Sequence, residues 1–148
     1  MRGKLLVRKN KGNLDSVIKR ARELHGHLGP FLVIGVKIGE FAKETLNGKM
    51  EALVKVPMAT PFSCVIDGVQ ASTQCTVGNR RLLLENSEKE ITIHFKLQGS
   101  KKMLRIYVNQ QLVEELKQKL LQGVPDEELA WKVAQMPKNS IFTWKINK

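Results

Sequence analysis

Two histidines and two cysteines carry most of the chemistry that this sequence offers. His25 and His27 lie two positions apart in the six-residue segment HGHLGP, residues 25–30. Residues two apart point about 200° apart on a helix, so both imidazoles can face one ligand only from a loop. Gly29 suits such a loop, and Pro30 suits the first turn of a following helix, where free N–H groups favour an anion. The segment therefore predicts a loop that presents imidazoles to a ligand.

The cysteines lie in a second segment about forty residues later. Cys64 directly precedes a helix expected to start near Ile66, and a thiol at a helix N-terminus has a lowered pKa that favours the thiolate. Cys75 follows eleven residues on, roughly 16 Å away along a continuous helix. Zinc–sulfur bonds near ~2.3 Å exclude a zinc ion shared by both. Cys64 is therefore the candidate ligand or nucleophile, and Cys75 a packed side chain.

Polar residues follow Cys64 on the same expected helix. Asp67 is one turn away, where it would either support a metal ligand from behind as an acceptor or be an ordinary first-turn acid. A thiolate, one or two imidazoles and a carboxylate make an incomplete tetrahedral set for zinc or another divalent transition metal, which leaves a position for water or substrate. Without a metal, Cys64 and His27 would form a nucleophile and base pair. Both interpretations stay open at this point.

The elements that must position these side chains follow from apolar periodicity and from the residues that start and stop helices. The pattern predicts one domain over residues 1–148, of the α+β class, with an antiparallel sheet and packed helices. Helices are expected from a cap at Asn13 or Asp15 to Leu24, from Pro30 to about Leu46, from about Ile66 to Cys75, from Gln110 to Gln122 and from Asp126 to Gln135. Strands are expected over 52–56, 91–97, 103–108 and 141–146, the second and third joined as a hairpin.

Charge and composition limit the partners. The chain has 148 residues, with 25 Lys and Arg against 14 Asp and Glu, a formal net charge of +11. This charge favours anionic partners such as phosphorylated small molecules or nucleic acid. The basic residues are spread along the chain and aromatic residues make up 5%, so a solvated basic surface is favoured over a nucleic-acid platform. Without a long apolar run or the apolar core of a signal peptide, a cytoplasmic protein without a membrane span is expected.

Together the two segments resemble the family of the formylmethanofuran dehydrogenase E subunit. The family pattern runs approximately H-G-H-x-C-P-G and later C-x-x-D-x-x-Q-x-x-x-G-C-T-x-G-K. The present chain has HGHLGP, then Cys64-x-x-Asp67-x-x-Gln70, then Cys75-Thr76-x-Gly78. The resemblance covers about residues 14–109 and leaves the C-terminal helices and short strand over 110–148. It implies an α+β core that forms a homodimer, here without the cysteine-rich zinc finger that follows the core in some members.

Several positions depart from that pattern. Gly29 stands where the family has a cysteine, so one potential metal ligand is missing. Phe31 and Gln74 each replace a glycine, and Asn79 replaces the final lysine. Arg80 and Arg81 follow Asn79 as candidate anion contacts. These departures predict an altered metal site or a changed ligand set.

Carried over position by position, the resemblance implies a site and a range of functions. The resemblance leaves His25, His27, Cys64, Asp67, Gln70, Cys75 and Thr76 as the candidate site. Of these, His25, His27, Cys64 and Asp67 are the candidate metal ligands, and Cys64 and His27 are the candidate catalytic pair. Gln70 and Thr76, with the nearby Arg80, are the candidate contacts of a cofactor. The implied function is an accessory or metal- and small-ligand-binding protein related to one-carbon metabolism of the methanogenesis type, whose partner is a small anionic ligand or an oxidoreductase complex. A metal-assisted hydrolase or thiol enzyme, and a basic nucleic-acid adaptor, are the alternatives. Whether the chain is an enzyme stays open.

Overall fold

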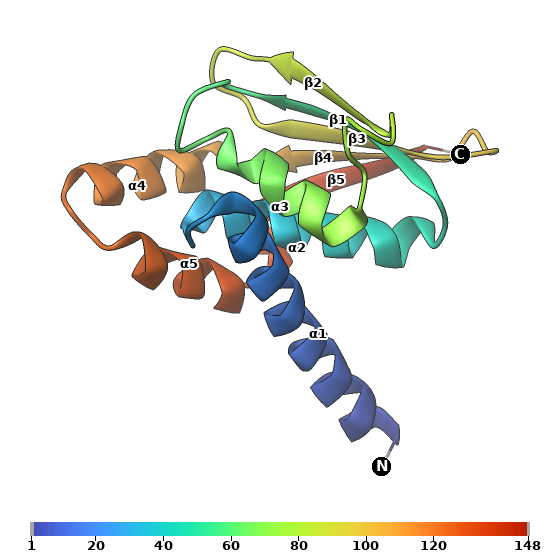
Figure 1. Cartoon of the computed structure of the whole chain (residues 1–148), viewed down its shortest axis with the longest axis horizontal. Coiled ribbons are helices and arrows are strands. Elements are labelled where there is room, and N and C mark those ends of the chain that lie inside the picture. Colours follow the sequence, from blue (N-terminus) through green and yellow to red (C-terminus); the bar gives the residue numbers. More distant parts are fainter. Residues whose placement is uncertain (1, 148) are drawn as a thin grey trace.

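The structure is a computed structural model that describes the backbone of residues 2–147 and the side chains of residues 13–147. Its elements are α1 (Arg2–His25), α2 (Pro30–Leu46), β1 (Met50–Val56), α3 (Cys64–Thr73), β2 (Leu82–Asn86), β3 (Thr92–Leu97), β4 (Met103–Val108), α4 (Gln110–Leu121), α5 (Asp126–Gln135), α6 (Lys138–Ile141) and β5 (Phe142–Asn147). Figure 1 shows the strands gathered in one layer, with α2 and α3 along one face of the sheet and α1 projecting away from it. The predicted α+β class is confirmed.

The sheet has the strand order β2-β1-β3-β4-β5. β1 pairs antiparallel with β3, β3 with β4, and β4 with β5, but β1 and β2 are parallel. The expected antiparallel sheet is therefore a mixed one. Its parallel pair arises because α3 connects β1 to β2 as a crossover, which returns the chain in the same direction. The pattern of residues 82–86 predicts no strand, so β2 was not expected.

Alternating side chains of the strands face the helices. In β1 the buried residues include Ala52 and Val54, and their neighbours on β3 are Phe95 and Ile93, both fully buried. This period of two is the pattern of a sheet with one covered face. The opposite face carries Leu53, His94 and other side chains that are partly exposed.

Helices α2 and α3 approach each other closely because glycines line their contact. A Cβ atom at Gly35 would lie 2.2 Å from the carbonyl oxygen of Val65, and one at Gly68 would lie 2.2 Å from that of Leu32. One turn further on, a Cβ at Gly39 would overlap the side chain of Ser72. The contact advances in the same direction along both chains, so the helices are parallel. Their N-termini, where the predicted site residues lie, are therefore side by side.

Two helix starts differ from those expected. The backbone of α1 is helical from Arg2, so neither Asn13 nor Asp15 caps it. Asn13 instead donates from Nδ2 to Oε1 of Glu40 at 3.0 Å, a contact with α2 that no local pattern signals. α3 begins at Cys64 rather than near Ile66. No helix in the described part of the chain is long and apolar enough to cross a bilayer.

Candidate functional site

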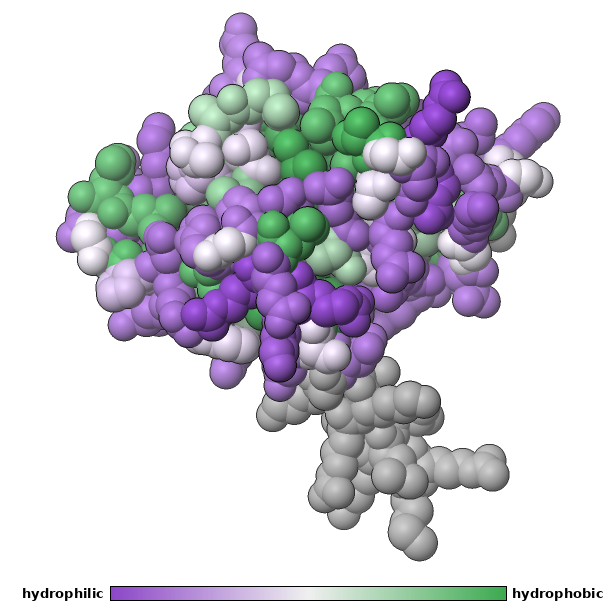
Figure 2. Space-filling view, in the orientation of Figure 1, coloured by the Kyte–Doolittle hydropathy of each residue, from purple (hydrophilic) through white to green (hydrophobic). Residues whose placement is uncertain are grey.

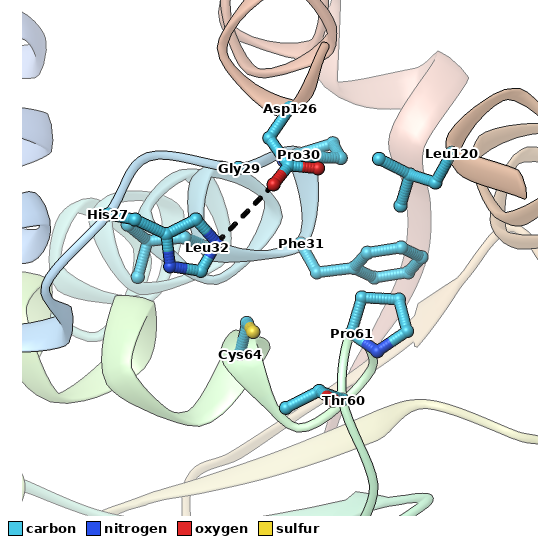
Figure 3. A pocket seen from close by; sticks show the side chains of 10 residues that line it. All are labelled: His27, Gly29, Pro30, Phe31, Leu32, Thr60, Pro61, Cys64, Leu120 and Asp126. Atoms are coloured by element: carbon cyan, nitrogen blue, oxygen red, sulfur yellow. Dashed lines mark ion pairs between the residues drawn. The ribbon is translucent and has the colours of Figure 1, made fainter. Parts of the chain in front are cut away.

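A cavity of about 410 Å³ lies between the loop at residues 25–29 and the starts of three helices (Figure 3). Its lining is His27, Gly29, Pro30, Phe31, Leu32, Thr60, Pro61, Cys64, Leu120 and Asp126. The volume is within the ~300–1,000 Å³ of small-molecule sites, and an apolar wall with a few polar groups is typical of them. Figure 3 shows the side chains of His27, Cys64 and Asp126 directed toward the same space.

Packing of the helices against α2 creates this cavity. Pro30, Cys64 and Asp126 are the first residues of α2, α3 and α5. The glycine contact holds α3 against α2. Lys37 of α2 holds α5, because its Nζ donates to the carbonyl oxygens of Val133 and Ala134 at 3.4 and 3.0 Å, near the end of α5. The positive charge of Lys37 also interacts favourably with the negative, C-terminal end of the α5 dipole.

Free backbone donors at the cavity come from α2. Its first internal bond runs from the N–H of Val33 to the carbonyl oxygen of Gly29, so the N–H groups of Phe31 and Leu32 have no partner in the part of the chain that the structure describes. The start of α3 differs, because the N–H groups of Cys64 and the two residues after it bond to carbonyls of the preceding turn. An anionic group of a ligand would therefore be bound at the N-terminus of α2.

His27 faces a carboxylate that the sequence analysis did not assign to the site. Its Nε2 lies 3.8 Å from Oδ2 of Asp126, and both side chains are about half exposed. Asp126 was predicted only as the first residue of a helix, where an acidic residue is ordinary. Its role at the cavity depends on α5 packing beside α2, about a hundred residues away in sequence. A local pattern therefore gave no signal for it.

His25 belongs to a network behind the cavity. Its Nδ1 lies 2.7 Å from Oδ2 of Asp67, and Nε2 of Gln70 donates to Oδ1 of the same carboxylate at 2.8 Å. Asp67 therefore supports the imidazole from behind, one of the two roles considered for it. The rings of His25 and His27 lie 4.8 Å apart between centroids. Nε2 of His25 is buried and has no hydrogen-bond partner among the described residues.

Cys64 lines the cavity but is not the activated thiol that its helix position predicts. Burial raises the pKa of the Cys64 thiol, and the carboxylates of Asp67 and Asp126 raise this pKa further, against a smaller lowering by a backbone hydrogen bond. Cys64 as a whole residue is 6% exposed. The sequence-based expectation of a thiolate was wrong because it counted the helix dipole alone, without burial and without Asp126.

The raised pKa of Cys64 predicts slow alkylation. In a Cys75→Ala background, iodoacetamide is expected to modify Cys64 at neutral pH more slowly than an exposed cysteine. Asp126→Asn removes one of the causes and is expected to shift the pH midpoint of alkylation downward, followed by mass spectrometry. Glu128→Gln changes the same charge in the same helical turn, outside the cavity lining, and should leave the midpoint in place. A wild-type midpoint below the ordinary thiol pKa of about 8.5 would instead support a thiolate.

The predicted metal ligands are not gathered into one metal-binding cluster among the described residues. Among the described residues, no group of three or more His, Cys, Asp and Glu side chains is arranged to hold a metal ion. Asp67 is engaged by His25 and Gln70, and position 29 has no side chain to contribute. The buried Nε2 of His25 could serve as a metal ligand. The side chains around it, as arranged in the described residues, do not supply the other ligands of a three-ligand metal site.

The remaining predicted residues lie away from the cavity, beyond the C-terminus of α3. Thr76 and Asn79 close a turn through two hydrogen bonds of 3.0 Å. Arg80 lies two residues before β2 in a left-handed conformation, φ 65°. Cys75 is fully buried and its Sγ donates to the carbonyl oxygen of Met50 at 3.3 Å, as a packed side chain would. Gln74 ends α3 at φ 64°, a conformation that favours the glycine of the family pattern.

Comparisons with known proteins give one family model that matches most of the chain. The family model described as "FmdE, Molybdenum formylmethanofuran dehydrogenase operon" matches residues 24–144. A protein of Archaeoglobus fulgidus, named a probable S-adenosyl-L-methionine-binding protein, is 32% identical over 111 residues, which make up 71% of the chain and 30% of that protein. The chain thus spans about three tenths of the length of this relative. A tungsten formylmethanofuran dehydrogenase FmdE-like protein from Syntrophus aciditrophicus has a similar fold, with a TM-score of 0.64 at 15% identity over 91% of the chain and 72% of that structure.

Proposed function

The chain belongs to the FmdE family, and on that premise we propose that it is an accessory protein that binds a small organic ligand in the cavity at His27, Cys64 and Asp126. The observation that carries the proposal is this cavity, in which apolar walls surround a few convergent polar groups. Such a combination is the usual form of a small-molecule site. The proposal assigns binding and no chemical reaction.

The polar groups favour a ligand that carries both signs of charge. The free N–H groups of Phe31 and Leu32 suit a carboxylate, because they lie at the positive end of the α2 dipole. Asp126, which lines the same cavity, suits a cationic group of the ligand. Phe31, Pro61 and Leu120 line the same cavity and offer apolar surface to a planar ring.

S-adenosylmethionine is the first candidate with this chemistry. It combines a carboxylate, an ammonium and a sulfonium cation with an adenine ring. The name of the Archaeoglobus fulgidus relative supports this choice, although the chain matches 30% of that protein. S-adenosylmethionine also donates one-carbon groups, so the proposal agrees with the one-carbon metabolism that the resemblance implies.

The alternative functions have less support. A thiol enzyme needs a nucleophilic thiolate, and burial and two carboxylates raise the pKa of Cys64. A metal-assisted hydrolase needs a metal held by several side chains, and the donor set among the described residues is short of that. A nucleic-acid adaptor stays a prediction from the +11 charge alone. The cavity is therefore the stronger basis for a function.

Asp126→Asn tests the proposed ligand directly. In titration calorimetry with S-adenosylmethionine, we expect it to weaken binding by roughly tenfold to a hundredfold, since a hydrogen bond to a charged group contributes about 1.5–3 kcal/mol. Glu128→Gln is the matched control, because it removes the same charge from the same turn of α5 and should leave the affinity unchanged. Absence of binding at millimolar S-adenosylmethionine, or an equal loss in both variants, would contradict the proposal.

A further inference from the structure

Hydrophobic side chains gather at the free edge of β2. This strand is the last of the sheet at one end, with β1 as its neighbour on one side only. Leu83 and Leu84 of β2 are 66% and 39% exposed, although the two point to opposite faces. Two further exposed hydrophobic residues lie at its ends. Val77 precedes it in the turn leading to Arg80, and the backbone N–H of Met58 donates to the Asn86 side chain. Figure 2 shows hydrophobic surface in this part of the molecule.

Such an edge is unusual for a strand that stays unpaired. Edge strands normally carry lysine, proline or a bulge that prevents another strand from pairing with them. The opposite edge strand, β5, carries an exposed Lys145. β2 has neither lysine nor proline, and exposes consecutive leucines instead. Its row of backbone donors and acceptors is therefore available to another strand.

The sequence of β2 with the residue before it is complementary to itself. Residues 81–85 read Arg-Leu-Leu-Leu-Glu. Two such segments paired antiparallel about Leu83 place arginine opposite glutamate at both ends and leucine opposite leucine at the three positions between them. Cross-strand pairs of opposite charge and of apolar residues each stabilise a sheet by roughly 0.2–1 kcal/mol.

The side chains of Arg81 and Glu85 can each form a further ion pair with a second copy. Glu85 is exposed, and its Oε2 lies 3.8 Å from Nζ of Lys55. The guanidinium of Arg81 donates to the carbonyl oxygens of Met50 and Gln74 at 3.4 and 3.2 Å, which uses two of its five N–H groups. Neither contact occupies the outer edge of the strand.

We propose that β2 pairs antiparallel with β2 of a second copy of the chain, so that two five-stranded sheets become one continuous sheet. The pairing covers Leu83 and Leu84 and joins Arg81 of each copy to Glu85 of the other. We assign a second copy as the partner because an antiparallel copy of residues 81–85 places a positive charge opposite a negative charge at both ends. The interface is independent of the ligand in the cavity.

Charge reversal tests the interface in solution. By light scattering after size exclusion at about 100 µM, where even weak complexes are populated, the wild type is expected at twice 16.8 kDa. Arg81→Glu and Glu85→Arg each create two like-charge pairs, and each is expected to weaken dimerisation roughly tenfold. The double variant restores opposite charges and should recover the dimer. This recovery also separates a lost interface from a misfolded chain.

A cysteine at the centre of the pairing tests its register. Opposed residues of antiparallel strands lie about 4.5–5.5 Å apart between Cα atoms, within the range of a disulfide. Leu83→Cys is therefore expected to form a covalent dimer under mild oxidation, whereas Leu121→Cys, equally exposed on α4, should not. Cys64 and Cys75 are buried in the wild type and should not contribute. A monomeric wild type, or a dimer that survives Leu83→Lys and both charge reversals, would overturn the proposal.

Discussion

Gly35→Ala is expected to destabilise the domain by about 3 kcal/mol or more, the upper range for overpacking a core. The sign is informative, because the same change in an ordinary helix stabilises it by about 0.5–1 kcal/mol. Here the new methyl group would lie 2.2 Å from the carbonyl oxygen of Val65 and 3.0 Å from Cα of Gly68. Backbone atoms cannot rotate away as a side chain can, so α2 and α3 must separate.

Urea denaturation and thermal melting measure this effect. A loss of about 3 kcal/mol corresponds to roughly 6–12 °C in Tm for a domain of this size. Gly78→Ala is the control, because the nearest atom to its new methyl group is Oγ1 of Thr76 at 3.9 Å. An unchanged or increased stability of Gly35→Ala would show that the helices are further apart than described. Separation of α2 from α3 should also weaken ligand binding, since their N-termini form two walls of the cavity.

Elements with local start and stop signals could be predicted from the sequence. Pro30 starts α2 and Asn47 follows its end, and the expected hairpin joins β3 to β4. β2 could not be predicted because only its first residue, Leu82, is buried and the other four are exposed, so the strand lacks the alternation of a half-buried strand. Its position depends on α3 packing against α2, which is a tertiary effect. The same crossover makes its pairing parallel.

The candidate site was predictable only where its parts are close in sequence or match the family pattern. The structure brings His27 and Cys64 to one cavity and joins His25 to Asp67, all of them residues that the sequence motifs single out. Asp126 was missed, because its contribution requires the C-terminal helix to pack beside α2. The pKa of Cys64 was predicted in the wrong direction for a related reason, since burial is set by the whole fold. Zinc or another transition metal stays a prediction.

Gly29→Cys is expected to create a zinc site that the wild-type chain lacks or holds only weakly. Gly29 has φ −141° and ψ 171°, an extended conformation that any residue adopts. A Cβ atom there lies 3.4 Å from Nε2 of His27 and 3.9 Å from Cβ of Asp126. The new thiol would therefore enter the cavity that His27 and Cys64 line. Two thiols and an imidazole form the protein ligand set of some catalytic zinc sites, so about one zinc ion per chain is expected.

Metal content by mass spectrometry, on tag-free protein purified without chelators, compares the variants. Gly29→Ala supplies the Cβ without the thiol and should bind no more zinc than the wild type. Adding Cys64→Ala to Gly29→Cys should remove the gained metal if both thiols are ligands. Equal zinc in Gly29→Cys and Gly29→Ala would mean that position 29 does not reach the other donors. Near-stoichiometric metal in the wild type, lost in both His27→Ala and Cys64→Ala, would instead establish the metal site predicted from the sequence. In that case Gly29, in place of the family's cysteine, would remove one ligand without preventing metal binding.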